Sequence, residues 1–138
     1  MKIVINSCYG GFELSARATK RLAEMEGKEC YFFIQNYPDE TYVQITEEEA
    51  QLIHRAWEAY DIPDPAQNSS DDHYIYYNNI ERDDARLIQV VEELGEEANG
   101  VHALLRIVEI PDGTSWEIKE FKEYDGIEHI AEVHQTWY

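Results

Sequence analysis

Cysteine is scarce in this chain, and long apolar runs are absent from it. Cys8 and Cys30 are its only cysteines, too few for the disulfide framework that stabilises small secreted domains. No stretch approaches the ~18 consecutive apolar residues that a membrane-spanning helix needs. The apolar start at residues 1–6 is too short for a secretory signal peptide. We therefore expect a cytoplasmic protein with reduced thiols and no contact with a membrane.

Basic residues are also few, since 11 Lys and Arg stand against 29 Asp and Glu, a formal net charge of −18. Residues 1–38 hold five basic and four acidic residues (net +1), and residues 39–138 hold six and 25 (net −19). Such a field repels phosphate backbones and attracts basic surfaces. We therefore expect no direct nucleic-acid binding, and a basic protein or ribonucleoprotein complex as partner. Solubility alone is the competing explanation of the charge.

The 138 residues predict one domain, spanning residues 1–138, with a core that needs neither disulfides nor metal. Apolar periodicity predicts strands at 2–6, 30–35, 41–45, 74–77, 104–110, 116–124 and 127–133. It predicts helices from 16 to about 26, from 47 past Trp57 to a point before Pro63, and from about 85 to Asn99-Gly100. The late run of strands favours an α+β fold with a mainly antiparallel sheet and about three helices.

Local signals mark the ends of several of these elements. Ser15 and either Asp83 or Asp84 are suited to cap the first and third helices. Thr46 followed three residues later by Glu49 is a capping box for the second helix. Asp125-Gly126 predicts a hairpin turn between the last two strands.

A strand, a pair of glycines and a helix follow one another at the N-terminus. Such a junction can present backbone N–H groups to an anion, and it could activate the Cys8 thiol, with His129 or His134 as the base. Gly10 and Gly11 lack a full phosphate-loop signature, and a small residue beside a tight turn explains Cys8 equally well. These three residues form a possible ligand junction, and no catalytic residue is assigned.

Metal and cofactor signatures do not emerge from the spacing of the candidate ligands. His129 and His134 are five residues apart, whereas a zinc-binding helical pair is four apart. The aspartates between residues 61 and 72 lack the spacing of a calcium loop. We therefore expect neither a metal nor a cofactor.

Clusters of acidic residues are the strongest functional indication in the sequence. Gathered on one surface, they could imitate a phosphate backbone and occupy the nucleic-acid channel of a basic protein. Trp116, Trp137 and the tyrosines at 74, 76 and 77 could anchor such a contact, although Trp116 could equally be core. The candidate partner-binding acids are Glu47, Glu48, Asp71, Asp72, Glu92, Glu93, Glu96 and Glu97.

Two segments resemble an uncharacterised family of small bacteriophage and prophage proteins. They are residues 2–12 (KIVINSCYGGF) with Leu14-Ser15, and a C-terminal region that includes residues 108–112 (VEIPD), Trp116 and residues 124–126 (YDG). The resemblance implies a phage origin, and hence the cytoplasm of a host cell, but no mechanism and no functional residues. It favours an accessory or counter-defence role by association.

Together these observations favour a non-enzymatic phage accessory protein that binds and inhibits a basic, nucleic-acid-handling host or defence protein. The concrete form of this hypothesis is an anti-CRISPR or another anti-defence protein, and DNA mimicry is one way in which it could act. Two alternatives stay open. One is a protein that binds or sequesters a small ligand such as a signalling nucleotide. The other is a structural phage protein whose charge only keeps it soluble.

Overall fold

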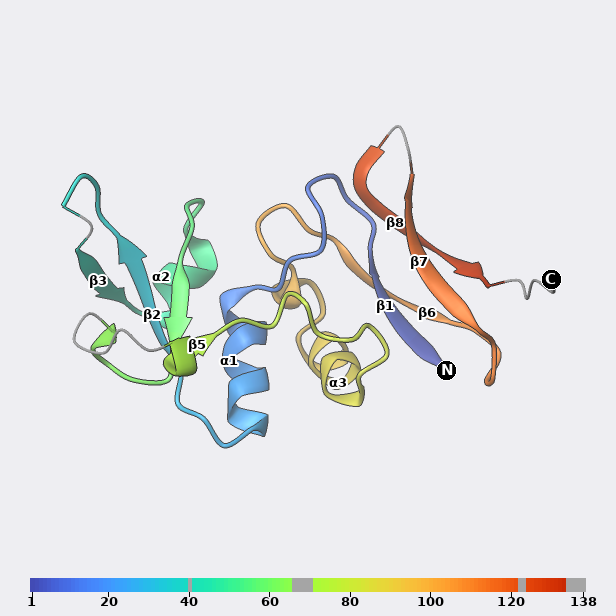
Figure 1. Cartoon of the computed structure of the whole chain (residues 1–138), viewed down its shortest axis with the longest axis horizontal. Coiled ribbons are helices and arrows are strands. Elements are labelled where there is room, and N and C mark those ends of the chain that lie inside the picture. Colours follow the sequence, from blue (N-terminus) through green and yellow to red (C-terminus); the bar gives the residue numbers. More distant parts are fainter. Residues whose placement is uncertain (40, 66–70, 122–123, 134–138) are drawn as a thin grey trace.

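The structure, a computed structural model, describes residues 1–39, 41–65, 71–121 and 124–133 (Figure 1). The helices are α1 (Ala16–Met25), α2 (Glu47–Leu52) and α3 (Ala85–Leu94), with short 3-10 segments at Asp71–His73 and Gly95–Ala98. The strands are β1 (Lys2–Asn6), β2 (Tyr31–Gln35), β3 (Tyr42–Ile45), β4 (Glu58–Tyr60), β5 (Tyr74–Ile75), β6 (Leu105–Glu109), β7 (Trp116–Phe121) and β8 (Tyr124–Glu132). Every pairing among these strands is antiparallel, which confirms the predicted α+β class.

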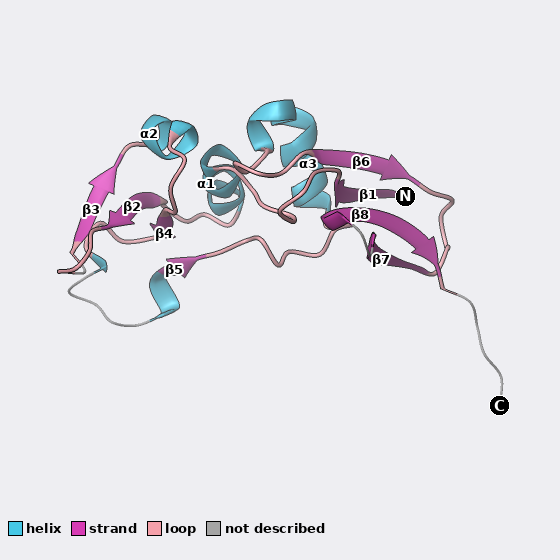
Figure 2. Ribbon diagram, turned by 90° about the horizontal axis from the view of Figure 1, so that it is seen from above, coloured by secondary structure: helices cyan, strands magenta, loops and turns pink. Residues whose placement is uncertain are grey.

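One half of the molecule is the four-stranded sheet β3-β2-β4-β5. Its core face carries Phe32, Ile45, Ala59 and Ile75, which pack with alanines from α1 and α2. Figure 2 shows α2 on that side of the sheet and α1 beside it. Because side chains alternate along a strand, the neighbours of these core residues point to the opposite face, away from both helices.

The other half is built on β1, which pairs with β6. Val4 of β1 packs with Leu22 of α1 and Leu87 of α3 in a second apolar cluster. The hairpin β7–β8 lies beside β1 (Figures 1 and 2), where the backbone N–H of Asn6 donates to the Glu128 carboxylate at 2.8 Å. This side-chain bond joins two strands that share no backbone ladder.

The predicted helix starts are confirmed. The Ser15 hydroxyl accepts the backbone N–H of Ala18 at the start of α1. Thr46 and Glu49 form the full capping box at α2, each side chain bonded to the other residue's backbone. Asp84 caps α3. These contacts join residues two or three apart, so the local sequence suffices to specify them.

The prediction of a second helix reaching past Trp57 is wrong. α2 ends at Leu52, and residues 58–60 form β4, which pairs with both β2 and β5. Trp57 and Ala59 contact the core, whereas Glu58 and Tyr60 lie on the other face of the sheet. That two-residue spacing is typical of a strand, and β2 supplies the partner that stabilises it.

The third helix is shorter than predicted. It ends at Leu94 because Gly95 takes a positive φ of 58°, and the chain continues as a 3-10 segment to Ala98. Ala98 is still fully buried, as the apolar periodicity requires.

The position of the last hairpin turn is also corrected. Phe121 of β7 pairs with Tyr124 of β8, so the chain has already reversed before Asp125-Gly126. Both residues lie within β8 instead. Gly126 therefore serves a purpose other than turning the chain.

Candidate functional site

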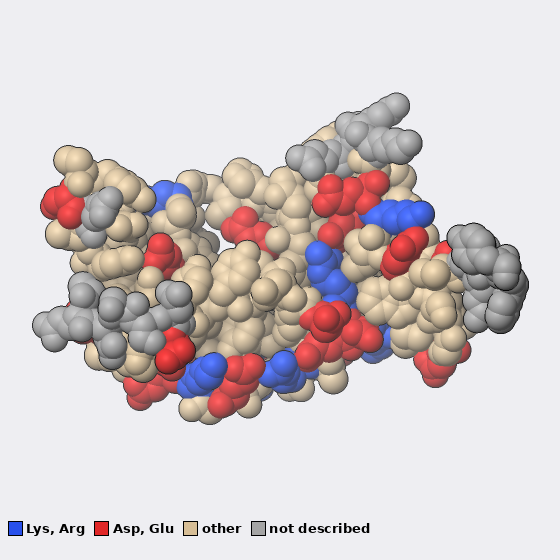
Figure 3. Space-filling view, viewed as in Figure 1, with Lys and Arg blue, Asp and Glu red and all other residues tan. Residues whose placement is uncertain are grey.

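The predicted partner-binding acids on α2 and on the segment from α3 to Ala98 lie at the surface, but most of them are paired with cations of the same chain. The pairs are Lys2–Glu92 (2.8 Å), Arg17–Glu97 (2.9 Å), Lys20–Glu47 (3.1 Å) and Arg21–Glu93 (3.1 Å). The slightly basic N-terminal segment thus lies against the acidic helices. On the face shown in Figure 3, acidic and basic side chains also alternate along the lower edge. Paired charges make a mixed surface rather than a continuous imitation of phosphates.

The remaining candidate acids differ in their surroundings. Glu48 and Glu96 are exposed and form no ion pair within the part of the chain that the structure describes. Asp72 is exposed near β5. The side chain of Asp71 lies outside the described residues, as do His134 and Trp137. The structure therefore does not gather the eight predicted acids into one unpaired patch.

The glycine pair at the ligand junction is covered by the protein's own chain. A Cβ atom added to Gly126 would lie 2.2 Å from the backbone nitrogen of Gly11 and 2.8 Å from that of Gly10. The Asn6 side chain fastens this contact, because its Nδ2 donates to the carbonyls of Cys8 and Gly126, both at 2.7 Å. The glycines thus let β8 approach the turn closely, and this packing explains them without a ligand.

Cys8 itself is half-buried beside this turn. His129, the candidate base, lies in β8, where its ring contacts Phe121 with centroids 4.6 Å apart. Among the residues that the structure describes, no hydrogen bond joins the Cys8 thiol to the His129 imidazole, and the buried His129 Nδ1 has no hydrogen-bond partner.

The sequence did not predict a connected row of aromatic rings on the helix-free face of the four-stranded sheet. We call Phe33, Tyr42, Tyr60, Tyr74 and Tyr76 the tyrosine face. Neighbouring ring centroids are 5.4–6.4 Å apart, and Tyr74 and Tyr76 are stacked with an interplanar angle of 24°. Phe33 is buried beneath the others, whereas Tyr74 and Tyr76 are 43% and 53% exposed. In the sequence these aromatic residues alternate with core residues, as expected for strands. The alternation around Tyr60 is recognised only once residues 58–60 are known to form β4.

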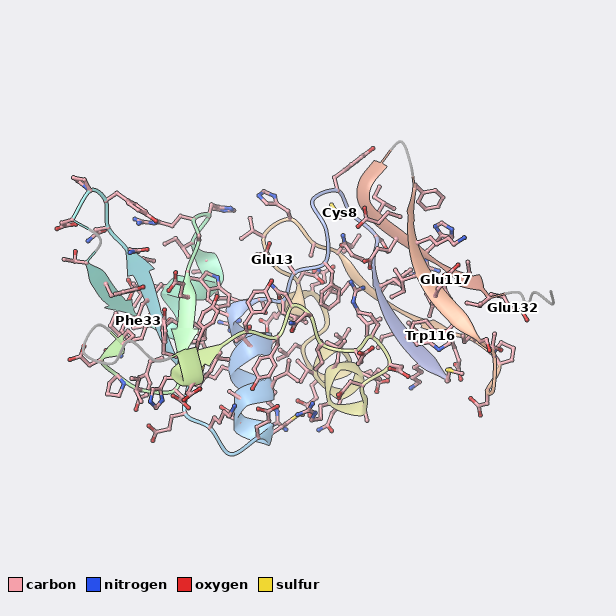
Figure 4. All side chains as sticks on the ribbon, viewed as in Figure 1. Cys8, Glu13, Phe33, Trp116, Glu117 and Glu132 are labelled. Carbon is pink, nitrogen blue, oxygen red and sulfur yellow. The ribbon has the colours of Figure 1, made fainter. Side chains whose placement is uncertain are left out.

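A cleft of about 360 Å³ adjoins the exposed end of the tyrosine face. Tyr74, Tyr76 and Glu58 line it from the sheet side, and Glu13 and His102 line it from the segments before α1 and after Gly100. The molecule is hollowed between these two halves in Figure 3, and Figure 4 labels Glu13 on the segment that leads into α1. The cleft is thus built by segments far apart in the sequence.

Hydrogen bonds fix the polar groups around this cleft. The Tyr60 hydroxyl donates to the Glu58 carboxylate at 2.6 Å. Burial, aided by this bond, raises the pKa of Tyr60, and burial likewise raises the pKa of Tyr74. The Arg55 guanidinium donates to the Gln35 carbonyl at 2.9 Å. Both tyrosines therefore keep their protons at neutral pH and remain hydrogen-bond donors.

The second cysteine, Cys30, is packed against the apolar core of the sheet, and burial raises its pKa from 9.0 to about 12. The folded protein thus holds this proton more tightly than the unfolded chain. The resulting stability is fully present below pH 9 and is lost as the pH rises toward 12. We expect the free energy of unfolding of the native protein to fall between pH 8 and pH 10.5. After allowance for solvent screening, this fall should be about 1 kcal/mol larger than the fall in Cys30→Ala.

Urea titrations of both proteins at the two pH values measure this difference. The tyrosines whose pKa values are raised by folding also make stability fall in this range, because in the unfolded chain they begin to lose their protons there. They are common to both proteins and cancel in the comparison. An equal loss of stability in the two proteins would show that Cys30 does not contribute.

Within the described residues, no three His, Cys, Asp or Glu side chains come together as a metal-binding group. In that same portion of the chain, no helix has the length and apolar character needed to cross a membrane. Comparison of the sequence and structure with protein-family models, curated proteins and solved structures found no match. The resemblance to phage proteins therefore stays a prediction.

Proposed function

We propose that this chain is a non-enzymatic binding protein that inhibits a basic, nucleic-acid-handling protein, and that it contacts its partner through the tyrosine face and the adjoining cleft. The observation that carries the proposal is the pair of exposed, stacked rings of Tyr74 and Tyr76 at the rim of the cleft. Tyrosines with large exposed area are over-represented among the residues that dominate binding energy.

The overall charge supports a basic partner. A net charge of −18 raises the rate at which a positively charged surface approaches, and it disfavours nucleic acid as a competitor. Many of the acids near α1 and α3 are already paired within the chain, so they are poorly suited to anchor a partner. Long-range attraction therefore comes from the net charge, and short-range anchoring from a different part of the molecule. The charge brings the partner near, and the tyrosine face holds it.

Inhibition follows if the bound surface of the partner is the one that handles nucleic acid. An acidic protein docked on that surface excludes the phosphate backbone both by volume and by charge. The predicted anti-CRISPR or other anti-defence activity is one instance of this mechanism, and the phage resemblance of the sequence is what favours it.

The test is an affinity capture of bacterial proteins by the tagged chain at low and high salt, followed by mass spectrometry. We expect a dominant basic partner whose capture weakens with salt. Replacing both Tyr74 and Tyr76 by alanine should lower the affinity for that partner about 30-fold or more, as expected for anchor residues. Tyr9→Ala is the matched control, because Tyr9 is 58% exposed but does not line the cleft.

A partner that binds the double variant and the control equally well would contradict the tyrosine face as the contact. A captured partner whose nucleic-acid binding or cleavage is unchanged by the pure protein would contradict inhibition. Both readouts use the full chain, and circular dichroism spectra of the variants establish that they are folded.

A small-ligand function is the second candidate, and the cleft rather than the glycine junction favours it. Its volume of about 360 Å³ falls within the ~300–1,000 Å³ of typical ligand pockets. A thermal-shift screen against nucleotides and other metabolites addresses this candidate. A ligand at a hundredfold excess over its Kd would stabilise the protein by about 2.7 kcal/mol.

A further inference from the structure

We infer that the cleft is a recognition pocket for an arginine side chain of the basic partner. This inference rests on the proposed function only in taking the partner to be basic. It adds the chemical group that the cleft accepts, and it can be tested without the partner.

The stacked tyrosines provide a flat aromatic surface for a planar cation. The rings of Tyr74 and Tyr76 are 6.1 Å apart and nearly parallel, and both line the cleft while remaining about half-exposed. A guanidinium group stacks on such ring faces through cation–π attraction. The protein already uses this contact elsewhere, because the Arg82 guanidinium lies 3.7 Å from the ring centroid of Phe12.

Carboxylates line the same cleft from both sides. Glu58 comes from β4 on the sheet side, where Tyr60 holds it in place at 2.6 Å. Glu13 comes from the opposite wall and packs directly over Gly100, where an added Cβ would lie 2.5 Å from Glu13 Cγ. The close fit over this glycine restricts the Glu13 side chain. Two positioned carboxylates favour a bound cation.

The cations that line the cleft do not cancel this preference. Arg55 is the only Lys or Arg among the described residues of the lining, and its guanidinium donates to the Gln35 carbonyl. His54 and His102 also line the cleft. With histidine counted as neutral, the charged side chains of the lining are two carboxylates and one guanidinium. An anionic ligand is therefore disfavoured, and a cationic one is favoured.

Arginine fits these features better than lysine. Its guanidinium is flat, so one face can lie against Tyr76 while its N–H groups, which point outward in the guanidinium plane, donate to carboxylates of the cleft. The lysine ammonium is compact and strongly hydrated, and it gains less from an aromatic face. We expect the pocket to prefer arginine to lysine by about fivefold at pH 8.

The test is an NMR titration of the full, ¹⁵N-labelled chain with N-acetyl-arginine amide at pH 8, with the uncharged N-acetyl-citrulline amide as the matched probe. We expect saturable shifts at Tyr74, Tyr76, Glu13 and Glu58 with arginine and none with citrulline. Glu13→Gln should weaken binding about tenfold. Glu96→Gln removes an exposed carboxylate outside the cleft and should leave the affinity unchanged.

Two variants at position 76 separate stacking from folding. Tyr76→Phe keeps the aromatic face and should bind arginine nearly as well as the native sequence, whereas Tyr76→Ala should bind about fivefold to tenfold more weakly. Equal shifts with arginine and citrulline would overturn the inference. The inference would also be overturned if the shifts were spread over all exposed acids and if Glu13→Gln and Glu96→Gln reduced them equally. In either case, a captured partner whose binding depends on Tyr74 and Tyr76 would still support the proposed function, with a group other than arginine bound at the cleft.

Discussion

Gly126→Ala is expected to destabilise the protein by about 3 kcal/mol or more. The added methyl group would lie 2.2 Å from the backbone nitrogen of Gly11, a distance that no relaxed structure allows. Because the obstacle is backbone, β8 must move away from the turn, and overpacking of this kind costs about 1–3 kcal/mol. The positive φ of 89° at Gly126 adds about 1–2 kcal/mol for any residue with a Cβ. Urea unfolding measures the sum.

Gly113→Ala is the matched control for this experiment. Gly113 has a similar φ of 79°, but nothing lies within 4 Å of the position its Cβ would take. We expect it to lose only the backbone term of about 1–2 kcal/mol. The difference between the variants therefore isolates the packing of β8 on Gly10-Gly11. Equal losses would mean that β8 does not rest on the glycine pair, and the ligand interpretation of the junction would regain its main support.

The features that sequence reasoning predicted correctly depend on neighbours within a few residues. The caps at Ser15 and Thr46 are made by side chains that reach only three positions along the chain. The apolar run at residues 2–6 likewise coincides with β1. The apolar face of α3 follows from helical periodicity, and Leu87 and Val91 are buried as it requires. A single sequence contains all of this information.

The features that it missed depend on partners distant in sequence. Local periodicity predicts a helix over residues 58–60, because it contains no sign of the strand that pairs with them from 25 or more residues earlier. The tyrosine face exists only once β4 places Tyr60 between Tyr42 and Tyr74. The ion pairs escaped prediction for the same reason, since Lys2 and Glu92 are separated by 90 positions.

Ion pairs between residues distant in sequence change the meaning of the acidic composition. Counting charges along the chain indicates a near-neutral start and a strongly acidic remainder, which suggests acidic helices open to a partner. In the folded protein the cations of the first segment lie against those helices. The composition still predicts attraction to a basic partner, because the net charge is unchanged by pairing. The place of contact, however, has to be inferred from the aromatic rings and the cleft.

Arg82→Met is expected to destabilise the protein by about 3–5 kcal/mol, because it leaves the buried Glu128 carboxylate without its counter-ion. The two terminal nitrogens of the Arg82 guanidinium, Nη1 and Nη2, donate to the two Glu128 carboxylate oxygens at 2.5 and 2.8 Å, and the Glu128 side chain is only 6% exposed. Glu128 also accepts the backbone N–H of Asn6, so this pair fastens the hairpin β7–β8 to β1. Urea unfolding gives the magnitude, and hydrogen exchange should show β8 losing protection before α3.

Two comparisons decide whether burial is the cause. Arg21→Met breaks the exposed pair with Glu93 and should cost at most about 1 kcal/mol. Combining Arg82→Met with Glu128→Gln removes both charges but keeps an acceptor for Asn6, so the double variant should be more stable than Arg82→Met alone. If Arg82→Met cost no more than Arg21→Met, the bridge would not fasten the hairpin. The apolar contacts of β7–β8 with β1 would then have to hold it in place.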